Sequence, residues 1–265
     1  LTGGSWLTAL ANDLGAGRFD GAWLVQNFEN LDPANTLWSK QYNVYAHVDT
    51  EAARYLGFEK YWGGHVFLNG GEMQYIVDNL FIGNKLATAE LVTSDGVRID
   101  LRNIRSPIVV FCSYGDNITP PHQALGWIPA VYEDTEDLKR AGQRIVYLTH
   151  PRTGHLGIFV SASVARLEHR AILESLEEIE ALPPGLYEMK IDNPSGDPDC
   201  RKPQYQVRFE PRRVEELHTD YPRAAFEQVR QMSEFNDTLY RVFASPGVQA
   251  FSNAWTSETL KWLHP

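Results

Sequence analysis

Two short runs of apolar residues dominate the hydrophobic pattern in the middle of the chain. They occupy 108–112 and 145–148, and turn-forming residues flank both. A short apolar run without alternation is typical of a strand buried on both faces, as in a parallel sheet. Helical patterns at 121–132 and 135–142 separate the two runs, and a third follows at 164–179. This order of strands and helices predicts an α/β protein whose parallel sheet has flanking helices and right-handed crossovers.

The first 105 residues have a different pattern, rich in aromatic residues and glycine. The pair Asp32-Pro33 is a strong helix start, with Asp32 as N-cap and Pro33 at the first helical position. A second helix start is Asp49, and Gly70-Gly71 precedes a further helical stretch at 72–82. We therefore expect residues 1–105 to form helices joined by glycine-rich turns.

Beyond residue 185 the pattern changes again. Apolar and polar residues alternate at 187–191 and at 205–209, which predicts two half-buried strands in a β-ribbon. Two amphipathic helical patterns follow, one beginning near Pro222 and one capped by Ser245. These changes divide the chain into three predicted parts, which are 1–105, 106–184 and 185–265.

Composition narrows the classes of partner and compartment. The 265 residues carry a formal net charge of −10, which argues against nucleic acid or an anionic membrane as the main partner. The apolar run at 108–112 is far shorter than the roughly 18 residues of a transmembrane helix. Two cysteines provide no disulfide framework and suit a reducing compartment, so we expect a cytoplasmic protein. The chain opens on Leu1 rather than methionine, and we interpret it as a piece of a longer protein.

An acid and a histidine follow the two predicted strands. Asp116 comes just after the first, and His155 lies in the loop after the second. Ligands and catalytic groups gather at this carboxyl edge of open α/β sheets. Acid before histidine is also the later part of the nucleophile–acid–histidine order of α/β-hydrolases. In such a triad the carboxylate holds the imidazole in one tautomer, and the other ring nitrogen takes the proton of the nucleophile.

Two other interpretations of these residues remain open at this point. Asp116 could cap the helix that follows it, with His155 an ordinary loop residue. His150 also competes for the role of base, since it lies nearer the end of the strand. We prefer His155, because His150-Pro151 resembles the start of a turn whereas His155 lies between small residues.

The sequence contains no convincing nucleophile. No Gly-x-Ser-x-Gly elbow, or its cysteine counterpart, precedes Asp116. Cys112 lies inside a predicted strand and is expected to be a core residue, while Cys200 follows the histidine and so has the wrong order. We therefore expect the nucleophile to lie upstream of this chain.

Metal and cofactor motifs are weak. No His-Glu-x-x-His pair is present, so no metal site is predicted. The acidic residues Asp192, Asp197 and Asp199 are interpreted as a solvated turn, because calcium-loop spacing is missing. The glycines at 15–21 miss the dinucleotide-binding spacing by one residue. No cofactor-binding residues are predicted.

Several motifs together resemble a known family. They are Ile-Asp-Leu at 99–101, Ile-Arg-Ser-Pro at 104–107, Gly-Asp-Asn-Ile-Thr-Pro at 115–120 and Gly-His-Leu-Gly at 154–157. These motifs resemble the C-terminal catalytic half of polyhydroxyalkanoate synthases. Stretches at 28–38, 62–64 and 182–187 more closely resemble a bacterial family of unknown function that is related to those synthases. The resemblance covers most of residues 1–190.

The resemblance implies a fragment of an α/β-hydrolase fold. Residues 1–105 would be a helical cap leading into the core, and 106–184 the C-terminal part of the core with the acid and histidine loops. Residues 185–265 would be a family-specific extension of β-ribbon and two helices. His155 would be the general base and Asp116 its acid partner. In the synthases a cysteine takes a 3-hydroxyacyl group from coenzyme A, which would here be part of the substrate and not a permanently bound cofactor.

We therefore expect an acyltransferase that acts on 3-hydroxyacyl-CoA thioesters as part of a longer chain. One alternative is a hydrolase of the same fold, an esterase, thioesterase or depolymerase with a serine nucleophile. The difference is how well water is kept from the acyl-enzyme. A second alternative is a catalytically inactive binding module. The expected partner is a small acyl thioester or ester, and a homodimer or association with a granule are both compatible with the sequence.

Overall fold

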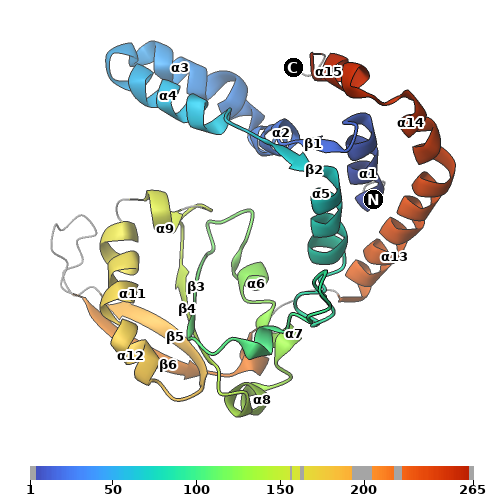
Figure 1. Ribbon diagram of the computed structural model, residues 1–265. Coiled ribbons are helices and arrows are strands. Elements are labelled where there is room, and N and C mark those ends of the chain that lie inside the picture. The colour runs from blue at the N-terminus through green and yellow to red at the C-terminus, as the bar shows by residue number, and fades with distance from the viewer. Residues whose placement is uncertain (1–3, 156, 162–163, 193–204, 218–222, 263–265) are drawn as a thin grey trace. The chain divides into compact units, whose positions relative to one another are not determined.

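The computed structural model describes residues 4–155, 157–161, 164–192, 205–217 and 223–262 (Figure 1). The chain divides into two compact units. One combines Leu1–Gly83 with Ala224–Pro265, and the other is Asn84–Arg223. We call them the helical unit and the sheet unit, and describe each on its own.

The sheet unit contains a four-stranded sheet in the order β3-β4-β5-β6. Its strands are β3 (Ile108–Ser113), β4 (Arg144–His150), β5 (Gly185–Asp192) and β6 (Gln206–Arg212). β4 pairs in parallel with both β3 and β5, and β5 pairs antiparallel with β6. The α/β class and its mostly parallel sheet are therefore confirmed.

The predicted β-ribbon is present as β5 and β6, but it is part of the main sheet. β5 lies beside β4 in parallel register, with Ile145 opposite Leu186. The two C-terminal helices that were expected to accompany the ribbon group instead with the first 83 residues. The structure thus groups the chain differently from the ranges 106–184 and 185–265. The roles of cap, core and extension given to the three ranges stay predictions.

Short helices connect the strands of the sheet unit. Those between β3 and β4 are α6 (Pro121–Ala124), α7 (Ile128–Val131) and α8 (Thr135–Arg140). Those between β4 and β5 are α9 (Gly157–Val160), a π-helical segment at Ala165–His169, α11 (Arg170–Glu174) and α12 (Leu176–Ala181). Single 3-10 turns lie at Leu101–Asn103 and Val214–Glu216. The helix expected at 121–132 is broken between α6 and α7, where Pro129 occupies the first turn of α7 and has no N–H to continue an earlier helix.

The core of the sheet unit lies on both faces of the sheet. Along β4, Ile145 and Tyr147 pack with Leu138 in one apolar cluster, while Val146 and Leu148 belong to a second cluster. Alternate residues of a strand point to opposite faces, so β4 is covered on both sides. Figure 1 shows α6 and α7 on one side of the sheet and α11 and α12 on the other. The burial expected for the run 145–148 is therefore observed, whereas in the run 108–112 only Cys112 is buried and the other four residues are half-buried.

The helical unit contains one small sheet in addition to helices. Its first part comprises α1 (Ser5–Leu14), β1 (Arg18–Asp20), α2 (Ala22–Glu29), a π-helical segment (Asn35–Ser39), α3 (Lys40–Ala46), α4 (Val48–Trp62), β2 (Phe67–Asn69), α5 (Gly70–Ile76) and a second π-helical segment (Val77–Ile82). Its second part comprises α13 (Arg223–Leu239), a π-helical segment (Tyr240–Ala244), α14 (Ser245–Phe251) and α15 (Ala254–Trp262). Asp32 accepts the N–H of Asn35 at 3.1 Å, as predicted for an N-cap. The antiparallel pair β1–β2 was not predicted, because strands of three residues carry too short a pattern.

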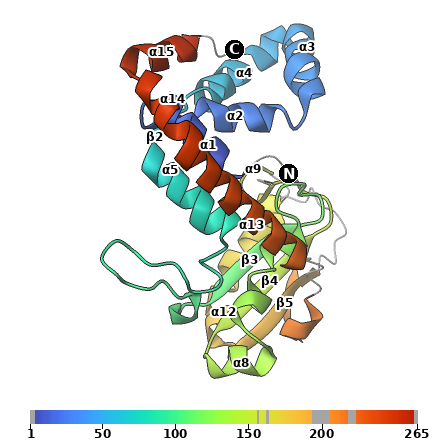
Figure 2. The ribbon, with the colours of Figure 1, turned by 90° about the vertical axis from the view of Figure 1, so that its right-hand side faces the viewer.

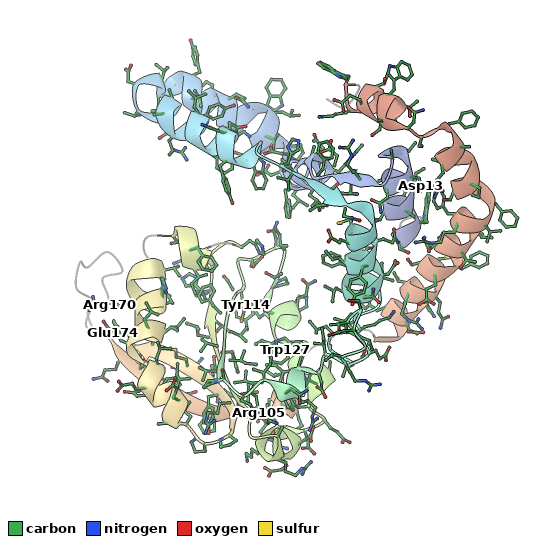
Figure 3. All side chains as sticks on the ribbon, in the orientation of Figure 1. Asp13, Arg105, Tyr114, Trp127, Arg170 and Glu174 are labelled. Atoms are coloured by element: carbon green, nitrogen blue, oxygen red, sulfur yellow. The ribbon has the colours of Figure 1, made fainter. Side chains whose placement is uncertain are left out.

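Polar contacts bind the two parts of the helical unit together. Asp13 on α1 accepts hydrogen bonds from Tyr240 Oη at 2.7 Å and from Ser245 Oγ at 2.6 Å (Figure 3). At the start of α1, the N–H of Ser5 donates to Ser233 Oγ at 3.0 Å. Figures 1 and 2 both show α14 beside α1, in agreement with these contacts. In the part of the chain that the structure describes, no helix is long and apolar enough to cross a membrane.

Candidate active site

The loops that follow β3 and β4 are tied to each other at the carboxyl edge of the sheet. The N–H of Tyr114, labelled in Figure 3, donates to the carbonyl of His150 at 2.9 Å. Ser113 Oγ lies 2.7 Å from the carbonyl of Thr153 and 3.0 Å from that of His150. A Cβ at Gly115 would collide with the Arg152 carbonyl, so only glycine permits this approach. The two loops that carry the predicted acid and base are thereby held in contact.

Asp116 is buried, and its carboxylate accepts hydrogen bonds that favour the ionised form. Oδ1 accepts the N–H groups of Ile118 and Thr119, each at 2.8 Å. Oδ2 accepts the hydroxyl of Thr119 at 2.7 Å. Burial acts to raise the pKa of Asp116, but these hydrogen bonds and that of His155 outweigh it, so the pKa lies well below its usual range. The carboxylate is therefore charged at neutral pH. It does not cap α6, whose N-cap is Pro120.

His155 faces this carboxylate through its Nδ1 atom. Nδ1 lies 3.0 Å from Oδ2 and 3.2 Å from Oδ1 of Asp116, and 3.1 Å from Thr119 Oγ1. Because Asp116 is ionised and accepts only, we assign the proton to Nδ1, which leaves a lone pair on Nε2. No residue described in the structure hydrogen-bonds Nε2, and the side chain is 36% exposed. The geometry therefore gives His155 an oriented and accessible basic nitrogen. The two residues predicted as a pair are brought together.

His150 is a structural residue of the same loop. Its Nδ1 accepts the N–H groups of Arg152 at 3.1 Å and Thr153 at 2.9 Å. Its Nε2 lies 3.6 Å from a carboxylate oxygen of Glu168. Burial, followed by the charge of Arg152, lowers the pKa of His150, so the ring is neutral with its proton on Nε2. Both ring nitrogens already have partners, which removes the basis for His150 as the competing general base.

Cys112, the cysteine on the strand that precedes the acid, is not a nucleophile for this pair. Cys112 is 3% exposed on β3, and its thiol contacts the carbonyl of Leu148 at 3.6 Å. Burial raises the pKa of Cys112 to about 12, which keeps the thiol protonated and unreactive. It is a core residue, as predicted. Cys200, Asp197 and Asp199 lie outside the described residues.

No group of three metal-ligating side chains occurs among the residues that the structure places. Asp192 is the one member of the acidic turn that it describes, and this carboxylate pairs with Arg208 across β5 and β6.

Thr119 is the residue of the candidate site that the sequence analysis missed. Its hydroxyl has one proton, which it donates to Asp116, while its oxygen faces Nδ1 of His155. The signal was present as a threonine three residues after an aspartate, a spacing typical of a side chain that folds back on its own loop. Local spacing of this kind does not reveal that the imidazole of His155 also contacts the hydroxyl oxygen of Thr119.

The comparisons with known proteins bear on the whole chain. A family model described as "Protein of unknown function (DUF3141)" matches residues 1–265. The chain belongs to this family. A relative from Rhizobium meliloti, described as "Uncharacterized protein in ackA 5'region", is 53% identical over 276 residues. That match covers 100% of this chain and 37% of the relative, so the DUF3141 chain spans little more than a third of that protein. No solved structure matches the chain.

Proposed function

We propose that this DUF3141 chain supplies the acid and the general base of a nucleophile–acid–histidine triad. The observation that carries the proposal is the contact of His155 Nδ1 with the ionised carboxylate of Asp116. Both residues follow adjacent parallel strands, where α/β enzymes gather their catalytic groups. The accessible Nε2 atom is the position from which a triad histidine accepts the proton of its nucleophile.

The reaction proposed is transfer of a 3-hydroxyacyl group from coenzyme A. This substrate class comes from the resemblance of motifs such as 115–120 and 154–157 to polyhydroxyalkanoate synthases. The nucleophile is a cysteine upstream of this chain, in the part of the protein represented by the longer relative. In this proposal residues 1–105 act as a helical cap.

His155 and Asp116 each have a defined role in the proposed acyl transfer. His155 Nε2 removes the proton of the nucleophile, whose sulfur attacks the thioester carbonyl. The carbon–sulfur bond to coenzyme A breaks, and the imidazolium returns the proton to the departing thiolate. His155 then deprotonates the hydroxyl of the acceptor, whose oxygen attacks the acyl-enzyme. The acyl carbon–sulfur bond breaks, and the imidazolium returns its proton to the sulfur of the nucleophile. Asp116 stays ionised throughout and stabilises each imidazolium that forms.

The test locates the nucleophile in the full-length protein. The protein is incubated with 3-hydroxybutyryl-CoA, quenched in acid and mapped by peptide mass spectrometry. An acyl adduct on an upstream cysteine, with acyl groups joined as esters in the product, supports transfer. An acyl adduct on a serine, with free 3-hydroxybutyrate as the product, would contradict acyl transfer and support hydrolysis instead. Absence of both adduct and coenzyme A release, repeated with 3-hydroxydecanoyl-CoA, overturns the enzymatic proposal in favour of a binding module.

A further inference from the structure

The helical unit contains a cavity of about 690 Å³ that is separate in sequence from the Asp116–His155 pair. Its walls come from α1, β1, α2, β2 and α15. The apolar lining includes Leu7, Leu10, Leu14, Trp23, Phe67 and Leu260. This volume falls in the range of small-molecule sites, which is roughly 300–1,000 Å³. A surface of this composition favours an aliphatic or aromatic group over water.

Two cations lie against one aromatic ring at this cavity. The guanidinium carbon of Arg18 is 5.3 Å from the centre of the Phe67 ring, and Lys261 Nζ is 5.0 Å from the same centre. Both side chains also line the cavity. Contact with the ring holds each cation near the apolar wall, so an anion bound between them keeps its apolar remainder inside.

The carboxylates of the cavity do not neutralise both cations. Glu258 lies 3.6 Å from Lys261 and compensates part of its charge. Asp20 accepts the N–H of Ala22 at 3.0 Å and lies 3.7 Å from His65 Nε2. Arg18 forms no ion pair with any residue that the structure describes. The cavity therefore combines apolar walls with one exposed cation, Arg18, that is free of ion pairs within the described residues.

We propose that this cavity binds an amphiphilic anion, a carboxylate with a single aliphatic chain. The carboxylate lies at Arg18, beside the Phe67 ring and within reach of Lys261. The aliphatic chain of the ligand lies among the leucines of α1 and Leu260 of α15. Charge complementarity selects the carboxylate over an alcohol or an ammonium head group, and the apolar walls select the chain. This site is independent of the proposed acyl transfer.

The experiment measures binding to the full-length protein by isothermal titration calorimetry. Three probes share a ten-carbon chain and differ in the head group, namely decanoate, decanol and decyltrimethylammonium. We expect one decanoate to bind per chain, decanol to bind at least about tenfold more weakly, and the ammonium probe not to bind. Equal binding of all three would indicate non-specific adsorption and overturn the proposal. Absence of decanoate binding would also overturn the proposal. This result is expected if another segment of the full-length protein fills the cavity.

Matched variants assign the head-group site. Arg18→Gln should weaken decanoate binding at least about tenfold and leave decanol binding unchanged, because a charge-assisted hydrogen bond contributes about 1.5–3 kcal/mol. Arg98→Gln is the control, since Arg98 is an exposed arginine of the sheet unit. Equal effects of the two substitutions would contradict the assignment.

A second variant fills the part of the cavity proposed to hold the aliphatic chain of the ligand, and it does not change the charge of the protein. Leu10→Trp places a larger side chain in the cavity, so binding of decanoate and decanol should both be lost. Thermal melting of the variant verifies that it is folded. A folded Leu10→Trp protein that binds decanoate as well as the wild type would place the ligand elsewhere and overturn the proposal.

Discussion

Thr119 connects the acid and the base at the scale of single residues. Its hydroxyl donates to Asp116 Oδ2 at 2.7 Å, and its oxygen lies 3.1 Å from Nδ1 of His155. Rotation of the carboxylate would break the first contact, and rotation of the imidazole would break the second. Thr119 is therefore a positioning residue for the pair, acting through Asp116 and not on the substrate.

Replacing this hydroxyl tests that role. Thr119→Val keeps the shape of the side chain and removes its donor, so we expect kcat to fall about 10–100-fold with little change in KM. Thr119→Ser keeps the hydroxyl and should stay within a few fold of the wild type. The kcat and KM of the full-length protein with 3-hydroxybutyryl-CoA provide the measurement. A valine variant with wild-type kcat, or a serine variant as slow as the valine one, would remove Thr119 from this role.

The depressed pKa of Asp116 also determines how the site responds to acid. A group whose pKa is lower in the folded state stabilises the fold above its unfolded pKa, which is about 3.9 for aspartate. That contribution is lost as the pH falls through the lower folded value. The carboxylate partner of His155 is thus preserved at mildly acidic pH.

Sequence patterns predicted Asp116 and His155 because the topology of a parallel sheet brings the ends of adjacent strands together. They did not decide between His155 and His150. That choice depends on the N–H groups of Arg152 and Thr153, which point at His150 Nδ1 only once the loop has folded.

At the scale of elements, the apolar run of β4 predicted its burial correctly but not its neighbours. The strand separates the two apolar clusters, with Tyr147 in one and Val146 in the other. Alternation along 187–191 likewise predicted a strand. It carried no information that this strand would join β4, because pairing between distant strands depends on the whole chain and not on a local period.

The packing of α8 on this sheet makes a quantitative prediction. Leu138 on α8 is fully buried in the cluster that contains Ile145, so Leu138→Ala should lower the opening free energy of β4 by about 2–5 kcal/mol. Hydrogen exchange of β4 peptides in the full-length protein measures this quantity. Leu173→Ala on α11 is the control, because Leu173 is 56% exposed and should change it by less than about 0.5 kcal/mol. Equal losses in the two variants would contradict the packing described.

At the scale of the whole molecule, the chain holds two members of the proposed triad and matches only part of a longer relative. The matched region covers 37% of the Rhizobium meliloti protein, while Cys112 is buried and protonated. The sequence predicts an upstream nucleophile from the lack of a local elbow motif before Asp116, and this stays a prediction. It could not predict that the C-terminal helices and the first 83 residues form one unit, since Asp13 and Tyr240 are separated by more than 200 positions in the chain.

The most direct test of the proposed triad is the turnover of the full-length protein after removal of one imidazole. The measurement is the rate of coenzyme A release from 3-hydroxybutyryl-CoA, with thermal melting to verify the fold. His155→Ala should reduce this rate at least about 1,000-fold, because the members of a triad act as a unit. His122→Ala, which removes an exposed histidine from α6, should leave the rate unchanged. A folded His155→Ala protein that turns over at close to the wild-type rate would contradict the role of His155 as general base.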